Sequence, residues 1–85
     1  MPDPASTIQR TLVLRRVNPE QGVARFYMLA VERDLFGTVR LVRHWGRIGA
    51  IQGRELAQDF LTEAEAIQAL ERLAAAKRRR GYRDL

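Results

Sequence analysis

Hydrophobic and polar residues alternate along much of this chain with the two-residue period of β-strands. The segments 11–17, 23–32 and 38–45 are rich in aliphatic, branched and aromatic residues, and residues that favour turns separate them. A weaker fourth strand is expected over 52–58, after a stretch punctuated by glycines. In the segment 23–32 both alternating sets are apolar, so we expect this strand to lie at the centre of a sheet.

The last third of the chain changes to a helical period. Its apolar residues recur at three- and four-residue spacings, which predicts one helix with a single buried face: Ile67, Leu70, Leu73 and Ala74. Thr62 and Glu65 form a capping box at the start of this helix, since each side chain can bond the other's amide. The helix is expected to reach about Arg80. Gly81 can then take the left-handed position of a Schellman end, with Tyr82 folding back.

This order of elements predicts the fold class. Strands come first, one helix comes last and the connections are short, which favours an α+β domain: an antiparallel β-sheet with one C-terminal helix packed across it. Residues 1–9 contain two prolines and little to bury, so we expect a flexible N-terminal arm. Residues 10–85 are then a single domain, because 85 residues suffice for one core only.

The residues that catalysis and metal binding require are scarce. The chain has no cysteine, which excludes disulfides and thiolate–zinc sites, and His44 is its only histidine. Ser6 offers the only serine hydroxyl, and no base is marked beside it. We therefore expect no enzyme, no metal and no cofactor.

Net charge and hydropathy restrict the partners and the location. The formal net charge is +5 and the isoelectric point is near 11, which favours an anionic partner such as nucleic acid. No apolar stretch approaches the roughly 18 residues of a membrane span, and the first residues do not resemble a signal peptide. We expect a cytoplasmic protein without a membrane partner.

The chemistry that is present centres on Trp45-Gly46-Arg47, which holds the only tryptophan. An aromatic ring can stack on a base or sugar, and a guanidinium can bind phosphate in a bidentate manner. Trp45 can equally be the anchor of a small core, and the sequence leaves both interpretations open. Every basic residue except Lys77 is an arginine. The basic residues 77–80 can also be explained without a ligand, because positive charges stabilise a helix C-terminus.

The segments 24–29 and 41–49, followed by Phe60, the helix start at 62–66 and Gly81-Tyr82, resemble the WGR domain, and in particular its small free-standing bacterial members. The resemblance implies an antiparallel sheet with one helix against it. In DNA-damage-dependent poly(ADP-ribose) polymerases this domain binds DNA breaks near a 5′ end. There the motif tryptophan packs on a terminal sugar and the motif arginine lies by the backbone.

These roles fall on Trp45 and Arg47 in this sequence, and Arg25 matches a basic residue before the family's Phe-Tyr pair. Ala24 stands where the polymerases typically have asparagine, so one polar contact is missing. No catalytic domain accompanies the motif, so signalling by ADP-ribosylation does not carry over.

Two functions remain. The first is a non-catalytic nucleic-acid-binding module that prefers DNA ends or nicks; its expected binding residues are Trp45, Arg47, Arg25, Arg43, Lys77 and Arg78. The alternative is a protein–protein interaction adaptor that uses Leu35-Phe36 and an exposed sheet face. Neither alternative fixes the oligomeric state.

Overall fold

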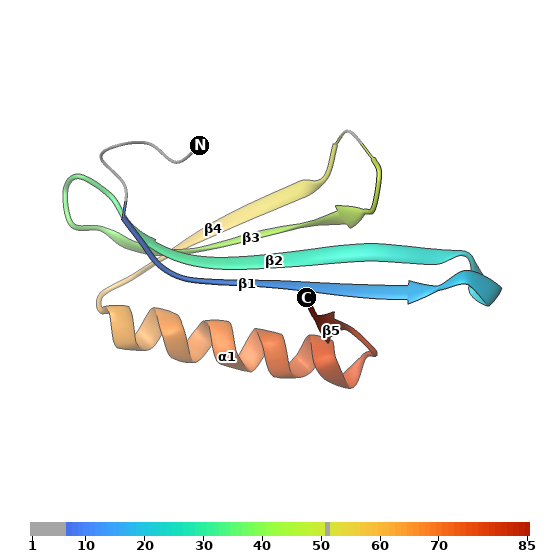
Figure 1. The fold of residues 1–85 in the computed structure, drawn as a ribbon. Helices are drawn as coiled ribbons and strands as arrows, with labels where there is room; N and C mark the ends of the chain where they lie inside the picture. Colours follow the sequence, from blue (N-terminus) through green and yellow to red (C-terminus); the bar gives the residue numbers. More distant parts are fainter. Residues whose placement is uncertain (1–6, 51) are drawn as a thin grey trace.

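A five-stranded sheet carries one helix across its face (Figure 1). The computed structural model describes residues 7–50 and 52–85. The strand order is β4-β3-β2-β1-β5, and every pairing is antiparallel. The elements in chain order are β1 (Thr7–Asn18), the 3-10 turn η1 (Pro19–Gln21), β2 (Val23–Arg33), β3 (Val39–Arg47), β4 (Arg54–Phe60), α1 (Glu63–Arg79) and β5 (Arg83–Asp84). The predicted α+β class is confirmed.

Several bounds differ from the prediction by a few residues, and one strand was not predicted. β1 begins at Thr7, so residues 7–9 of the expected arm belong to a strand, while residues 1–6 lie outside the described residues. β4 covers Arg54–Phe60 rather than 52–58. β5 was not predicted, because two residues are too few to show an alternating pattern. This strand exists because the chain after α1 returns to the edge of β1, where Asp84 pairs with Leu14.

β2 is the central strand, as its apolar pattern predicted, and it pairs with β1 and β3 along nearly its whole length. Residues directly opposite one another share a face of the sheet. Tyr27 therefore lies in one row with Leu14 of β1 and Trp45 of β3, and Arg54 of β4 extends the row. This row places the motif tryptophan on the same sheet face as the helix-side core residues.

The core lies between the sheet and α1. Its largest fully buried side chains are Leu14, Leu29, Val31, Leu41 and Leu70. The predicted helix face is partly wrong: Ala66, Leu70 and Ala74 are fully buried, whereas Ile67 and Leu73 pack at the border of the core. Small side chains at 66 and 74 let the helix approach the sheet closely. The line of closest contact therefore follows a four-residue spacing through them.

Both helix ends follow the sequence signals. Thr62 Oγ1 accepts a hydrogen bond from the amide of Glu65 at 3.2 Å. The second bond of the capping box, from the Thr62 amide to the Glu65 carboxylate, is not formed among the described residues. At the other end of the helix, the Tyr82 amide donates to the Lys77 carbonyl at 3.1 Å, and the Gly81 amide donates to the Arg78 carbonyl at 3.0 Å. With Gly81 at φ 98°, this is the predicted Schellman end.

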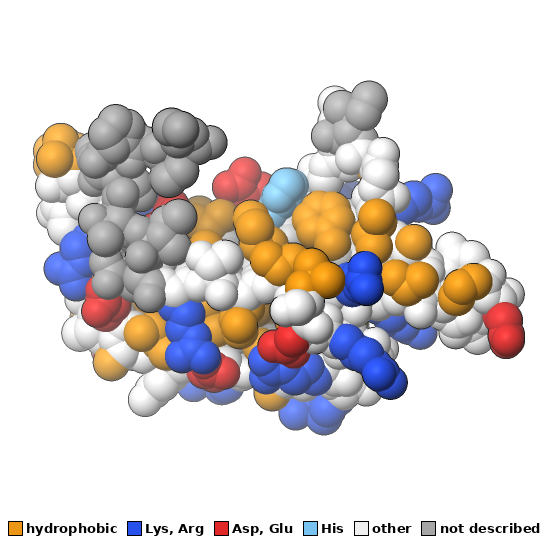
Figure 2. Space-filling view, viewed as in Figure 1, with side chains coloured by type: hydrophobic (Ala, Val, Ile, Leu, Met, Phe, Trp, Pro, Cys, Tyr) orange, Lys and Arg blue, Asp and Glu red, His pale blue; other side chains and the backbone are white. Residues whose placement is uncertain are grey.

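Among the described residues, no helix covers the opposite face of the sheet (Figure 1). Phe26 lies on this open face, half-buried, with its ring 5.3 Å from that of His44 in an edge-to-face contact. In Figure 2 hydrophobic side chains form a band along the sheet, and Lys and Arg side chains gather mainly below and beside it. Within the described ranges, no helix is long and apolar enough to cross a membrane.

Candidate nucleic-acid interface

The Trp-Gly-Arg motif forms the last three residues of β3. The Trp45 ring stacks on the ring of Tyr27 with a centroid distance of 5.7 Å and an interplanar angle of 18°. Tyr27 is buried, and Trp45 is half-buried and packs against the core. Trp45 also lines an open hollow. The two interpretations of this residue are therefore compatible: the ring packs on the core and still borders solvent.

The glycines of this region let the chain fold closely over the motif. A Cβ at Gly53 would lie 2.6 Å from the carbonyl oxygen of Trp45, and one at Gly46 would lie 3.2 Å from the Cα of Gly53. No side chain fits between these two backbones. The loop after the motif is thereby held against it, and β4 begins directly beside Trp45.

The first hollow, of about 530 Å³, brings three arginines around the motif. It is lined by Arg25, Trp45, Gly46, Arg47, Gln52, Gly53 and Arg54. Arg25 lies directly opposite Arg47 in the sheet, and Arg54 lies directly opposite Trp45. In the part of the chain that the structure describes, none of these arginines has an ion-pair partner. Their positive charge is therefore available to an anion.

A second hollow of about 220 Å³ adjoins the Tyr27 side of the same aromatic stack. Its residues are Tyr27, Arg43, Leu73, Ala76, Lys77 and Arg80. The Lys77 ammonium lies 4.4 Å from the centroid of the Tyr27 ring. Because the Schellman end turns the chain back, the Tyr82 ring also lies near this ammonium, at 5.5 Å. Such contacts stabilise a cation by about 0.5–1 kcal/mol at exposed sites.

The charges around Lys77 are all positive. Partial burial lowers the pKa of Lys77 below its ordinary value, and the charges of Arg80, Arg43 and Arg25 lower it further. Arg43 lines the second hollow and approaches both stacked rings: its guanidinium donates to the Tyr27 hydroxyl at 3.5 Å, and its central carbon lies 6.0 Å from the centroid of the Trp45 ring. Cations gathered without counter-charges are the electrostatic arrangement of an anion site.

Arg78 lies elsewhere. Its guanidinium binds the Asp84 carboxylate of β5 in a bidentate manner, with both hydrogen bonds at 2.8 Å. This bond lowers the pKa of Asp84 and raises that of Arg78. Arg78 lines neither hollow. The two hollows thus bring together the other residues expected from the sequence, namely Trp45, Arg47, Arg25, Arg43 and Lys77.

Sequence reasoning missed Arg54. The fourth strand was expected to begin too early, and an isolated arginine after a glycine carries no signal of its own. Only the register between β3 and β4 shows that Arg54 lies beside Trp45. Within the described ranges, histidine and carboxylate side chains form no group of three suited to a metal ion.

The fold and this basic, aromatic surface define a small domain with the features of a nucleic-acid-binding module. Residues 10–85 match the WGR domain, and the chain belongs to the WGR domain family. This is a family of non-catalytic, nucleic-acid-binding domains. The chain is also 39% identical over 72 residues to uncharacterized protein y4dW of Sinorhizobium fredii (strain NBRC 101917 / NGR234). The match covers 85% of this chain but 35% of that protein, so the chain spans about a third of the relative's length.

Proposed function

We propose that this protein is a non-catalytic module that binds DNA ends or nicks. One observation carries the proposal: Arg25, Arg43 and Arg80 lie close enough to Lys77 for their charges to lower its pKa, and Lys77 and Arg43 contact the stacked rings of Tyr27 and Trp45. A closed duplex covers the faces of its bases. An end or a nick exposes a terminal base and sugar that an aromatic ring can contact.

The residues divide the contacts between them. Trp45 packs on the terminal sugar or base, with its inner ring face fixed by Tyr27. Arg47 and Arg25, which face each other across β3 and β2, bind one phosphate group. Arg43 and Lys77 bind a second phosphate beside the Tyr27 ring. Arg78 contributes less to phosphate binding than these four cations, because the Asp84 carboxylate already binds its guanidinium and offsets its charge.

The test compares a nicked or blunt-ended duplex with a closed circle of the same sequence, over a range of salt concentrations. With two phosphate groups neutralised, log K is expected to fall against log salt with a slope near −1.8, at about 0.9 per phosphate. Arg15→Ala is the matched control, because Arg15 lies opposite Phe26 on the open face and lines neither hollow. Equal affinity for the circle, or binding indifferent to salt, would refute the proposal.

A second candidate, the adaptor, has a specific observation in its favour. Leu35, Phe36 and Leu61 are 71%, 89% and 90% exposed. Asp34 Oδ1 accepts from the amides of Phe36 and Thr38, both at 2.9 Å, and so fixes the β2–β3 turn that presents two of them. Leu61 follows Phe60, which pairs with Val39 at the same end of the sheet. An apolar group fixed in solvent suits a protein partner.

The two candidates use opposite ends of β3 and can be separated by substitution. Replacing Leu35 and Phe36 by serine should leave DNA binding unchanged, because neither residue lines the hollows. If that double variant lost DNA binding while keeping its melting temperature, the assignment of the interface to the Trp45 end would be wrong.

A further inference from the structure

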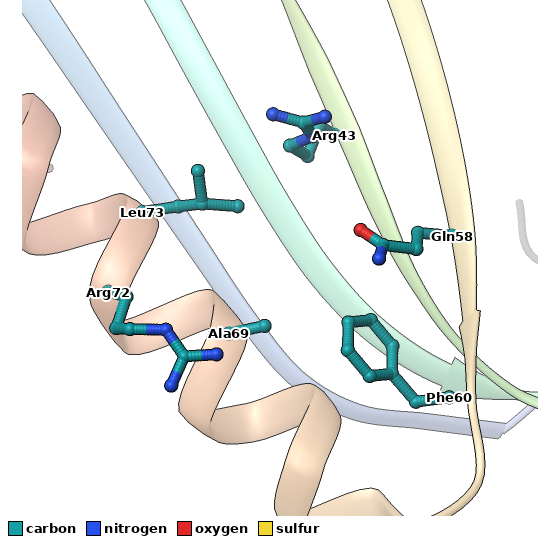
Figure 3. Close-up of a pocket in the computed structure, with 6 residues that line it drawn as sticks. All are labelled: Arg43, Gln58, Phe60, Ala69, Arg72 and Leu73. Carbon is teal, nitrogen blue, oxygen red and sulfur yellow. The ribbon is translucent and has the colours of Figure 1, made fainter.

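A third hollow lies on the helix side of the sheet, between α1 and β4 (Figure 3). Its volume is about 300 Å³, and its lining residues are Arg43, Gln58, Phe60, Ala69, Arg72 and Leu73. Gln58 and Phe60 point from β4 toward the helix, and Ala69 and Leu73 point back toward them. Every residue of β4 except Phe60 is exposed, so the helix leaves this strand uncovered. We call this space the α1–β4 groove.

The groove is continuous with the interface at Trp45. Arg43 and Leu73 line both the groove and the hollow that contains Lys77. Arg43 precedes Trp45 by two residues on the same strand and the same face, and Gln58 pairs with Leu41 two residues further along. At about 3.3 Å per strand residue, the path from Trp45 to Gln58 is roughly 13 Å. A polymer chain that leaves Trp45 along β3 therefore enters the groove.

The two walls of the groove differ in chemistry. On β4, Gln58 and Phe60 line the groove, and Leu56 precedes them on the same face, opposite Arg43 and 46% exposed. These side chains offer apolar contact and one amide. The other wall carries Arg72, which is exposed, and Arg43 lies between the walls. Across residues 7–50 and 52–85, neither arginine forms an ion pair.

We infer that the α1–β4 groove binds a short single-stranded extension of a DNA end, with its phosphates on Arg43 and Arg72 and its bases against Leu56 and Phe60. A single strand exposes base faces and backbone together, and proteins bind it by combining apolar or aromatic contacts with a basic path. An acidic peptide with apolar side chains would also match both walls; the continuity of the groove with the interface at Trp45 is what favours a strand that extends the DNA end. This inference rests on the proposed function, because the duplex end at Trp45 sets where the extension begins.

The experiment measures fluorescence anisotropy with a blunt-ended hairpin duplex and with the same hairpin carrying a 5′ or 3′ extension of about four nucleotides, the lower limit of common single-strand sites. One extension should tighten binding to the parent protein at least about fivefold, the effect of one base contact of about 1 kcal/mol. Arg72→Ala and Leu56→Ser should each reduce this gain while leaving the affinity for the blunt hairpin nearly unchanged. An extension with abasic sites should lose the part of the gain that depends on Leu56.

Arg15→Ala is the matched control, since it removes one charge from the opposite face and should leave the gain intact. Leu56 and Arg72 are exposed, so melting curves of both variants should match the parent. If neither extension tightens binding, or if the gain survives in both groove variants, the inference is wrong while end binding stands. If an acidic peptide binds in an Arg72-dependent manner and the extension does not, the groove is a protein site and the inference is also wrong.

Failure of the proposed function gives a different result. In that case the blunt hairpin would bind no better than a closed circle. A free oligonucleotide that still bound in an Arg72- and Leu56-dependent manner would show that the groove takes a single strand without the duplex end.

Discussion

Tyr27 and Trp45 face each other across β2 and β3, and their rings stack at 5.7 Å. This pair joins the hydrophobic core to the basic surface. Tyr27 is buried, and its hydroxyl accepts from Arg43, while its ring contacts the Lys77 ammonium. A substitution at either ring should therefore affect both folding and binding. The variants below are chosen to separate the two effects.

Trp45→Ala should weaken binding to a duplex end by about 1–3 kcal/mol, the typical contribution of one stacked group. It should also lower stability, because Tyr27 loses its stacked neighbour. Trp45→Phe keeps an apolar ring and should retain most of the stability while still reducing end binding. Titrations and denaturation curves of both variants are the measurements. If the Trp45→Phe variant bound duplex ends with the affinity of the parent, Trp45 would have a role in folding alone and none in DNA binding.

Arg47→Ala should weaken end binding and leave the melting temperature nearly unchanged. The Arg47 side chain is exposed and forms no ion pair with any described residue. An exposed guanidinium of this kind contributes little to folding. Arg78→Ala is the comparison, because Arg78 already binds Asp84 and should matter less for DNA. A larger loss of binding for Arg78→Ala than for Arg47→Ala would contradict the proposed site.

The lowered pKa of Lys77 gives opposite pH effects on stability and on binding. In the unfolded chain Lys77 has its ordinary pKa of 10.5, and in the folded protein this pKa is lower. In the pH range between the two values, Lys77 keeps its proton in the unfolded chain and has lost it in the folded protein. Stability should therefore rise with pH through this window. A bound phosphate favours the charged lysine, so DNA affinity should fall through the same window. Lys77→Arg stays charged and should bind with a flatter pH profile. Identical profiles would show that Lys77 contacts no phosphate.

Leu70→Ala should destabilise the fold by about 2–5 kcal/mol, since Leu70 is fully buried between α1 and the sheet. Ile67→Ala should cost less, because Ile67 lies at the border of the core and loses less contact. Chemical denaturation of both variants measures the difference. Equal costs would mean that the line of closest contact does not pass through Leu70.

Thr62→Ala removes the oxygen that accepts from the amide of Glu65 and should cost about 1 kcal/mol of stability. Thr62→Ser keeps a hydroxyl at the same position and is the matched control. Urea unfolding of the two variants should give a lower midpoint for the alanine protein and a nearly unchanged one for serine. DNA affinity at low temperature should change in neither, since Thr62 lines no hollow of the interface.

The features that could be predicted from the amino-acid sequence are those that depend on residues close together in the chain. Alternating apolar residues define the strands, Thr62 defines the helix start, and Gly81 with Tyr82 defines its end. These signals are local, because a strand face, an N-cap and a Schellman end each involve only a few successive residues. The Trp-Gly-Arg motif with its flanking segments was also sufficient to indicate the family.

Which distant side chains come into contact could not be predicted and became known from the three-dimensional fold. The register of β3 against β4 places Arg54 beside Trp45, and the return of the chain along β1 places Asp84 on Arg78. The closeness of α1 to the sheet, set by Ala66 and Ala74, brings Lys77 onto the Tyr27 ring. These contacts join residues far apart in the sequence. They follow from packing and strand register, which depend on the whole core rather than on neighbouring residues.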